Sequence, residues 1–577
     1  MKLILNLLRF NHFFRTVSIV LLTLFLLSCH PTSTVQTPPA VSPPVDGLDS
    51  LAIWTAPGES RPFLLANRTG TYFYGATGSE WDSGWMGLWI ERKRVLKNIS
   101  FLNAQGIKLE IDSAWCRVTP ADVTWIWEST PRQEVKLCFA ARRDTLYYLS
   151  ESGVRIEGAH WIQQKPADLP LLLRAELLDE LHNSYFSCAD TTYSRAVAWA
   201  NLQLLFLLAE DDSLLYAGIP WFNEGWGRDT FISLPGLLVT GHTDAARKIL
   251  TRFADWIDRD PDSPTYGRVP NRARPGEIVY NTADGTPWWI RELYEYGLYS
   301  RDFNFWNEMI KDSGAVRIAL DGALRKSDSL GFLHHPNEDT WMDAVAPDGV
   351  VTPRGNRAID ITALHATSLD LADRMAAAWP GIVPNDLRVK WRKTHESIHR
   401  NLLTYFLAPE GNHLWDRIQH DSKPDTVTRP NQLYALTVPY TPLIPPTIQS
   451  EIVRYVSREL ILPQGIMSLS PRDTAFHPYH MDPHYPKDDA YHQGIVWVWQ
   501  SGAAKSALRM EDRADLALQL ANYEARLMQE RGLVGSLPEL LDAKIRKGNK
   551  APNLSGTTTQ AWSLAEFLRT TYQDFLG

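Results

Sequence analysis

The chain has 577 residues, of which 44% are hydrophobic and 21% charged, and its formal net charge is −8. These values are typical of a globular protein with several domains, or with one large domain and a smaller one. The acidic balance argues against nucleic acid as a partner, because such proteins present a basic surface. The chain also contains 22 Trp, whose flat rings suit packing in a core and stacking on the apolar faces of sugars.

The first 29 residues have the pattern of a bacterial signal peptide. Basic residues precede an apolar run from Thr16 to Leu27, which is too short to span a bilayer comfortably. The run ends in Leu-Leu-Ser-Cys, which resembles the lipobox of bacterial lipoproteins, where cleavage leaves a lipidated Cys29. A plain signal peptide is the alternative. Residues 30–48, rich in Pro, Thr and Ser, predict an extended tether.

These features predict a protein of the bacterial cell envelope that an N-terminal lipid anchor holds to a membrane. The outer membrane is the favoured one, at its periplasmic or surface face. Cys116, Cys138 and Cys188 remain, so an oxidising compartment permits one disulfide, and the sequence leaves the pairing open. Because no Cys-x-x-Cys pair is present, we expect no zinc site, and nothing in the sequence calls for a metal or a cofactor. The oligomeric state is left undetermined.

Two regions of the chain differ in their hydrophobic period. Residues 49–188 contain short, often alternating segments such as Val123–Trp127, with turn signals between them, and they predict an antiparallel β-sandwich. From residue 189 to 577 the period is helical throughout. The predicted helices begin near residues 191, 228, 243, 285, 303, 359, 383, 429, 446, 490, 512 and 556.

Long loops rich in aromatic and polar residues precede every second predicted helix. They span residues 218–229, 267–286, 331–358, 411–430, 462–490 and 533–556. Six helical hairpins with elaborate loops on one side predict an (α/α)6 toroid as the second domain. An ordinary helical solenoid would also pair its helices, but it would not need to concentrate Trp, Arg and carboxylates in alternate loops.

Two of these loops carry carboxyl groups that suit glycoside hydrolysis. The reaction needs two carboxyl groups on either side of the scissile bond, one protonated and one ionised. Asp343 follows Thr-Trp-Met in the third loop, and Glu539 follows Gly-Ser-Leu-Pro in the sixth. In a closed toroid these loops lie on opposite sides of the central cavity. Either residue alone could instead cap a helix.

The same loops contain candidates for holding a sugar. Arg228 and Asp229 lie at the start of a predicted helix. They can bind neighbouring sugar hydroxyls through charged hydrogen bonds, or they can simply pair with each other and stabilise the loop. His492 can donate to a sugar or a carboxylate, or it can be a satisfied core histidine. The candidate substrate-binding residues are Trp226, Arg228, Asp229, Asn281, Asp284, Trp341, Arg354, His492 and Gln493.

Taken together and in order, several strings resemble one known family. They are WGRDTFISLPGLL at 226–238, VPNR at 269–272, YNT at 280–282, TWMDA at 340–344, VTPR at 351–354, RPNQ at 429–432, YHQG at 491–494 and QAWSLAE at 560–566. They resemble the C-terminal amylo-α-1,6-glucosidase domain of glycogen debranching enzymes, in collinear order from about residue 200 to 575. NRTGTY at 67–72 and GSEWDSGWMG at 78–87 are similar to the domain that precedes it in bacterial relatives.

The resemblance implies roles for individual residues. Asp343 matches the family's general acid, and Glu539 matches its general base, which activates water for inversion. Arg228 and Asp229 are similar to the pair that holds the terminal glucose in the related glucoamylases. The residues themselves agree with these roles, because desolvation beside Trp341 should raise the pKa of Asp343. Glu539 should stay ionised, and inversion requires the carboxyl groups to lie ~6.5–9.5 Å apart.

The chain also departs from the family. Where the family shows Glu, then Asn or Gln, then Trp, this sequence has Asp360, Thr362 and His365, which we expect to line the cavity. This departure puts the α-1,6 preference in doubt more than the reaction. The chain also lacks the glucanotransferase domain of the bifunctional eukaryotic enzymes.

The predicted function is therefore that of an inverting, exo-acting α-glucosidase, debranching in type, that releases glucose from α-glucan oligosaccharides. One alternative is an exo-α-1,4-glucosidase on the same scaffold. A second is a phosphorylase, in which phosphate would replace Glu539. A third is a non-catalytic, lipid-anchored sugar-binding protein, which would tolerate loss of either carboxylate. The presence of both carboxylates favours catalysis.

Overall fold

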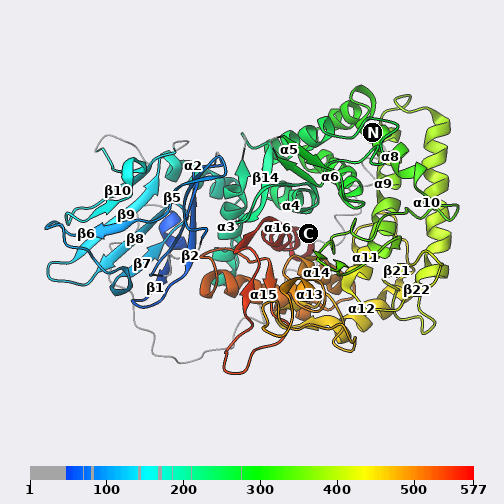
Figure 1. The fold of residues 1–577 in the computed structure, drawn as a ribbon. Coiled ribbons are helices and arrows are strands. Elements are labelled where there is room, and N and C mark those ends of the chain that lie inside the picture. Colours follow the sequence, from blue (N-terminus) through cyan, green and yellow to red (C-terminus); the bar gives the residue numbers. More distant parts are fainter. Residues whose placement is uncertain are drawn as a thin grey trace.

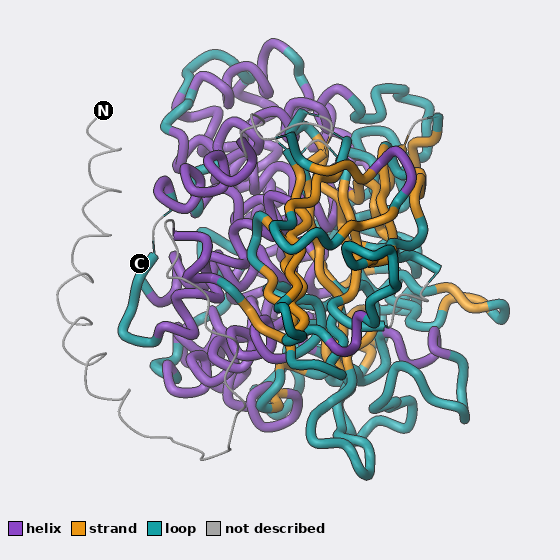
Figure 2. The backbone as a smooth tube through the Cα atoms, turned by 90° about the vertical axis from the view of Figure 1, so that its left-hand side faces the viewer, coloured by secondary structure: helices purple, strands orange, loops and turns teal. Residues whose placement is uncertain are grey.

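The structure is a computed structural model that describes residues 47–68, 70–79, 84–140, 144–166, 172–184, 186–209, 211–274 and 276–576 (Figure 1). The predicted signal peptide, Cys29 and the tether up to residue 46 lie outside the described residues. Strands gather in the N-terminal part and helices in the C-terminal part (Figure 2). This division confirms the predicted strand-rich and helical regions. Within the described ranges, no helix is both long enough and apolar enough to cross a membrane.

Two sheets form most of the N-terminal part. One has the strand order β1-β7-β8-β9-β10-β12, antiparallel except for its β10–β12 pair, and the other is the antiparallel sheet β2-β3-β4-β5. The sheets pack together through buried rings, because Phe63 of β2 lies edge-on to Trp125 of β8, with the ring centroids 6.0 Å apart. The strands are β1 (Ile53–Thr55), β2 (Pro62–Ala66), β3 (Tyr72–Ala76), β4 (Gly87–Ile90), β5 (Lys93–Leu96), β7 (Trp115–Val118), β8 (Asp122–Trp127), β9 (Gln133–Phe139), β10 (Leu146–Leu149) and β12 (Ile162–Gln164).

The cysteines of this part remain unpaired. Cys116, Cys138 and Cys188 are all free thiols. Cys116 lies on β7 and Cys138 on β9, and β8 runs between these strands. Two strand spacings of about 4.8 Å each separate such Cα atoms by more than the roughly 7 Å that a disulfide can bridge. The disulfide that the sequence permitted is therefore absent among these three residues.

The helical part begins after α2 (Leu172–Asn183). Its further helices are α3 (Thr191–Phe206), α4 (Gly227–Val239), α5 (Thr243–Asp255), α6 (Gly285–Ser300), α7 (Asn304–Asn307), α8 (Ala315–Arg325), α9 (Ile359–Ala378), α10 (Asn385–Phe406), α11 (Tyr434–Thr437), α12 (Pro446–Leu460), α13 (Lys487–Tyr491), α14 (Gln500–Met510), α15 (Ala514–Glu530) and α16 (Ala561–Thr570). Asp190 caps α3, since its carboxylate accepts from the backbone N–H groups of Thr192 and Tyr193.

Six helices pack in a closed order. Helix α4 contacts α6, α6 contacts α9, α9 contacts α11, α11 contacts α14, α14 contacts α16, and α16 returns to α4. These helices lie around one centre in Figure 1. A second set packs against them, with α3 on α16, α5 on α4 and α6, α8 and α10 on α9, and α15 on α14. The first set is buried on nearly every side, whereas α5 buries one apolar stripe that includes Ile249, Leu250 and Phe253.

The helical part differs from the sequence prediction in two ways. It is not helical throughout, because β13 (Leu208–Ala209), β14 (Leu214–Ile219), β15 (Phe222–Trp226), β16 (Arg272–Arg274) and β17 (Glu277–Val279) form a sheet with β28 (Thr559–Gln560). The helix expected near residue 490 is divided: the short helix α13 ends at Tyr491, and α14 begins at Gln500, since β25 (Val496–Trp497) pairs with β26 (Leu540–Leu541) between them. The helix near 429 is a 3-10 turn followed by the single turn α11, because Pro439 lies two residues beyond and cannot continue a helix.

Arg61 joins the two parts of the molecule. Its guanidinium donates to the carbonyl oxygens of Gln529 at 2.6 Å, Arg531 at 3.1 Å and Gly532 at 3.2 Å. These carbonyls lie at the C-terminal end of α15, where a helix leaves its last acceptors without internal partners and attracts a positive charge. Burial lowers the pKa of Arg61 to about 10, so it stays charged at neutral pH.

We predict that Arg61→Ala lowers the free energy of unfolding by about 2–3 kcal/mol, because buried acceptors lose charged hydrogen bonds. Urea denaturation followed by tryptophan fluorescence measures the change. Arg132→Ala is the control, since Arg132 forms an exposed pair with Glu134, and it should change stability by less than about 0.5 kcal/mol. Equal effects of the two substitutions would contradict an anchoring role for Arg61.

Candidate active site

Asp343 lies in a buried charge cluster with Arg228 and Asp284. The Asp343 carboxylate accepts from Arg228 Nη1 at 2.9 Å, and Arg228 Nε donates to Asp284 Oδ2 at 2.6 Å. Arg228 stands in the first turn of α4, and Asp284 directly precedes α6. Burial raises the pKa of Asp343, against the opposing charge of Arg228. The side chain of Asp343 is 28% exposed and that of Arg228 only 3%, so Asp343 is the member that a ligand can reach.

Glu539 is the second carboxyl group, and the loop after α15 carries it. Its side chain accepts from the Tyr491 hydroxyl and from the backbone N–H of Thr557 at 2.8 Å. Burial raises the pKa of Glu539 to about 7, although both hydrogen bonds act to lower it. With a pKa of about 7, Glu539 is partly ionised at neutral pH, so its role as the ionised carboxyl group stays a prediction.

The pKa of Asp229 responds to the charges of both Asp343 and Glu539. Burial raises its pKa to about 8, Arg228 opposes this shift, and the charges of Asp343 and Glu539 add to it. Gln560 Nε2 donates to Asp229 Oδ1 at 3.2 Å. Asp229 therefore holds a proton at neutral pH. The three carboxyl groups come from separate segments of the chain and lie near enough for their charges to interact.

An aromatic wall adjoins Asp343. Trp341 lies edge-on to His492, Trp497 and Trp499, with ring centroids 5.3–5.4 Å apart. The His492 ring stacks on Trp497 and is buried, and neither of its nitrogens has a hydrogen-bond partner among the described residues. Burial lowers the pKa of His492 well below its usual range. His492 is therefore a neutral part of the wall.

Arg354 lies behind this wall. It is 1% exposed, and its guanidinium donates to the carboxylates of Asp360 and Asp416 at 2.7–3.0 Å. Asn431 donates to Asp416 at 2.8 Å and accepts from the Trp341 indole N–H at 2.8 Å. Arg354 was expected to bind the sugar. Its guanidinium is instead held in buried ion pairs, away from a ligand, and through them it positions Trp341.

Asp360, Thr362 and His365 are all buried. Asp360 is paired with Arg354, and His365 Nε2 lies 3.1 Å from the hydroxyl of Ser327, beyond the end of α8. Successive side chains of a buried helix face different neighbours, so these two residues have protein partners, and the expectation that all three line the cavity stays a prediction.

The remaining candidates lie at the edges of the site. Gln493 accepts from Arg429 at 2.7 Å. Asn281 is exposed, and its side-chain oxygen lies 3.3 Å from the amide of Asn271. Trp226 is half-buried, and the guanidinium of Arg272 lies 5.4 Å from the centre of its ring. The structure thus joins Arg228 directly to Asp284 and Asp343. Asp229 and Glu539 lie near enough for their charges to interact, and Trp226 and Asn281 are more exposed.

Sequence reasoning missed the residues that hold the carboxyl groups. Tyr491 and Thr557 bind Glu539, Thr282 donates to Asp284, and Asn431 orients Trp341. Tyr491 and Asn431 belong to the strings YHQG and RPNQ. These strings indicated that the two positions matter, but they did not predict which residues Tyr491 and Asn431 contact. Thr557 had no signal, because its contribution is a backbone N–H group.

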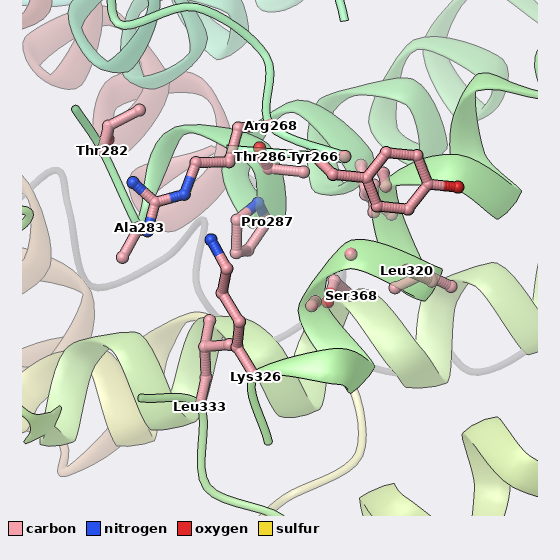
Figure 3. A pocket seen from close by; sticks show the side chains of 15 residues that line it. Tyr266, Arg268, Thr282, Ala283, Thr286, Pro287, Leu320, Lys326, Leu333 and Ser368 are labelled. Atoms are coloured by element: carbon pink, nitrogen blue, oxygen red, sulfur yellow. The ribbon is translucent and has the colours of Figure 1, made fainter. Parts of the chain in front are cut away.

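A further cavity lies beside this cluster, between α6 and α8 (Figure 3). Thr282 lines one side of it, and Arg268 and Lys326 contribute positive charge. Most of its remaining lining is apolar, including Pro287 and Leu320. Neither Asp343 nor Glu539 lines this cavity, so it is separate from the paired carboxyl groups. Among the described residues, no group of His, Cys, Asp and Glu side chains is arranged to hold a metal ion.

Comparison with known proteins defines the class and then the family. The family described as amylo-alpha-1,6-glucosidase matches residues 197–569. The glycogen debranching enzyme of Saccharomyces cerevisiae (strain ATCC 204508 / S288c) is 22% identical over 486 residues, which cover 62% of this chain and 30% of the yeast chain. This chain therefore spans less than a third of the length of that relative.

Solved structures show a shared fold. A GH78 family rhamnosidase of Bacillus sp. GL1 has a TM-score of 0.51 at 14% identity, over 90% of this chain and 46% of that chain. The GH63 mannosylglycerate hydrolase from Thermus thermophilus in complex with Tris has a TM-score of 0.49 at 13% identity, over 64% of this chain and all of that chain. The rhamnosidase match extends across both the strand-rich and the helical parts.

The chain shares its fold with a glycoside hydrolase. The family match covers more than half of the chain, so the chain belongs to the amylo-α-1,6-glucosidase family. The resemblance found in the sequence is thereby confirmed.

Gly556 makes the contact between Thr557 and Glu539 possible. Its φ is +71°, and a Cβ atom at this position would overlap Glu539 Oε2. Any side chain would therefore push the Glu539 carboxylate out of place, in addition to the cost of the left-handed conformation. The absence of a side chain at residue 556 thus determines where the carboxylate rests.

We predict that Gly556→Ala lowers kcat by about 10²-fold or more, because small displacements of reacting groups have large kinetic effects. Gly548→Ala is the matched control, since Gly548 has a φ of +92° and open space around its Cβ position. Both variants incur the backbone strain, but only the first disturbs Glu539. Steady-state glucose release measures the difference, and equal losses in the two variants would contradict the steric explanation.

Proposed function

We propose that this protein is an inverting, exo-acting α-glucosidase that releases glucose from α-glucan oligosaccharides, with α-1,6 linkages as the preferred substrate. One observation carries the proposal. Asp343 and Glu539 come from different loops, burial raises the pKa of both carboxyl groups, and the charges of both raise the pKa of Asp229. Family membership supports the α-1,6 preference.

We infer that the helices form an (α/α)6 toroid. The closed order α4, α6, α9, α11, α14 and α16 supplies the inner ring, and α3, α5, α8, α10, α12 and α15 supply the outer one. Arg228 and Asp229 stand in the first turn of α4, and Asp284 precedes α6. This placement directs the N-terminal ends of inner helices, which carry partial positive charge, toward the carboxyl cluster.

In the proposed mechanism Asp343 is the general acid. It donates its proton to the glycosidic oxygen as the bond from that oxygen to the anomeric carbon breaks. Burial raises its pKa, and a bound glucosyl unit would exclude water and strengthen this effect. Arg228 then stabilises the carboxylate that Asp343 becomes, since it already lies 2.9 Å from Asp343 Oδ2. Burial thus favours the protonated form of Asp343 before proton transfer, and Arg228 stabilises its carboxylate afterwards.

Glu539 is the general base. It takes a proton from water, whose oxygen attacks the anomeric carbon from the opposite face, so that an α-linked substrate yields β-glucose. The Tyr491 hydroxyl and the Thr557 N–H hold the carboxylate in place. After one turnover Asp343 is ionised and Glu539 protonated, and exchange of one proton with solvent restores the enzyme.

We propose that Asp229 and Arg228 position the terminal glucose, with Asp284 fixing Arg228. Trp341 and His492 would form the apolar wall of the sugar site, and Arg354 would act behind them as a positioning residue. Its chain of contacts through Asp416 and Asn431 ends on the Trp341 indole. Recognition of the sugar would thus depend on residues that do not touch it.

We also propose that the chain is attached to the bacterial cell envelope through a lipid on Cys29. The support is the sequence pattern alone. Metabolic labelling with a radioactive fatty acid tests it, with Cys29→Ser as the variant that should lose the label. Labelling that persists in this variant would contradict the proposal.

We predict that Asp343→Asn and Glu539→Gln each lower kcat by about 10²–10⁴-fold on isomaltose and panose, since each removes a proton-transfer group. The matched control is Glu338→Gln, a half-buried carboxyl group in the same loop as Asp343, which should leave the rate nearly unchanged. NMR should detect β-glucose as the first product. Initial α-glucose would contradict inversion, and the absence of glucose from wild-type protein in phosphate-free buffer would favour phosphorolysis or sugar binding.

The pH dependence follows from the pKa of Glu539. Below about pH 7 the base is protonated, so kcat/KM should fall about tenfold per pH unit on the acid side. Tyr491→Phe removes a hydrogen bond that lowers this pKa, and it should move the acid limb to higher pH. Tyr485→Phe, whose hydroxyl donates to the Tyr479 carbonyl oxygen, is the control. An acid limb that does not move in Tyr491→Phe would contradict the role of Glu539.

A further inference from the structure

Two tryptophans are exposed although they come from different parts of the chain. Trp85 lies just before β4 in the N-terminal sheets, and Trp221 lies in the turn between β14 and β15. Each is 38% exposed, and they are the most exposed tryptophans among the described residues. Their ring centroids are 6.1 Å apart and their planes meet at 58°. The two rings therefore form one open aromatic surface, which we call the aromatic platform.

The aromatic platform is supported from below. The Trp85 ring stacks on Trp89 at 5.8 Å and 16°, and Trp89 stacks on Tyr72 at 6.0 Å and 11°. The Trp89 indole N–H donates to the Trp85 carbonyl oxygen at 2.9 Å. Trp89 and Tyr72 are buried. Because three nearly parallel rings extend from the core to the surface, Trp85 is held in place before any ligand arrives, which reduces the entropic cost of binding.

A short series of contacts links the platform to Glu539. The Thr557 N–H donates to Glu539, and the N–H of the next residue, Thr558, donates to the Ile219 carbonyl oxygen at 3.1 Å. Ile219 precedes the turn that carries Trp221. Thr558 Oγ1 also lies 3.2 Å from the hydroxyl of Tyr74, on the strand that holds Tyr72. The loop that positions the proposed base is therefore bonded to both sides of the platform.

The size and chemistry of the platform decide what it can bind. If a tryptophan offers at most about 250 Å², the two rings expose about 200 Å² together, well below the roughly 800 Å² that a protein partner covers. Among the described residues near the platform, Arg92 pairs with Glu224 at 2.8 Å and Arg94 lies over the Trp89 ring. A small ligand with flat apolar faces and polar edges fits this surface, and a pyranose ring has that form.

We propose that the aromatic platform binds outer glucose units of an α-glucan oligosaccharide, those beyond the terminal glucose that is cleaved. The inference rests on the proposed function, because an exo-acting site holds one terminal unit and leaves the rest of the chain outside. The platform gives the N-terminal sheets a direct part in substrate recognition. It also sets a preference for chains longer than a disaccharide.

The test compares kcat/KM for a branched limit dextrin with kcat/KM for isomaltose. In Trp85→Ala/Trp221→Ala this ratio should fall about tenfold, and Trp85→Phe/Trp221→Phe should recover most of it. Tyr299→Ala is the matched control, since Tyr299 is a 40% exposed aromatic residue at the end of α6, and it should keep the wild-type ratio. If the double variant does not fold, as judged by circular dichroism, Trp221→Ala alone supplies the measurement.

A ratio that stays at the wild-type value in the folded alanine variants would overturn the proposal. Calorimetric titration of branched limit dextrin into Glu539→Gln, with and without the platform substitutions, separates this outcome from failure of the proposed function. Weaker binding without the platform supports the inference even if the wild-type protein releases no glucose. Equal binding contradicts it even if glucose release is fast.

Discussion

Arg228 lies between the carboxylates of Asp284 and Asp343, and the organisation of the site depends on this buried interaction. Asp229, Asp343 and Glu539 lie near enough for their charges to interact, and several uncompensated negative charges in a buried setting would be costly. Arg228 supplies one positive charge, and burial raises the pKa values of the three carboxyl groups so that they are not all ionised together. The same balance of charge and burial that a folded protein can tolerate would supply the acid and the base of the proposed mechanism.

Asp284, Glu539 and Trp341 are each held in position by a hydrogen bond with a neighbouring residue. Asp284 is held by Thr282, Glu539 by Tyr491 and the Thr557 N–H, and Trp341 by Asn431. These neighbours belong to the segments that connect the helices of the closed order, which include the short helix α13 and the 3-10 turn before α11. Because the helices are rigid and buried, the loops between them can be long and still hold carboxyl groups in fixed positions.

The N-terminal sheets are joined to this arrangement through polar contacts. Arg61 binds the end of α15, just before the loop that carries Glu539, and Tyr74 contacts Thr558 beyond it. The proposed base thus lies between two attachment points of the sheets. This connection gives a physical reason for the two parts to act as one unit. The aromatic platform adds a second role for the N-terminal sheets, which is to bind substrate.

The division into a strand-rich and a helical part, and membership of the family, could be read from the amino-acid sequence, because hydrophobic period and collinear strings are properties of neighbouring residues. The sheet around β14 and β15 was not predicted, because its pairs β15–β16 and β14–β28 join segments that are far apart in the sequence. Arg354 was assigned to the sugar, and only tertiary structure showed it buried between Asp360 and Asp416. Burial also decided that the pKa of Glu539 is about 7, since desolvation depends on residues that are distant in the chain and close in space.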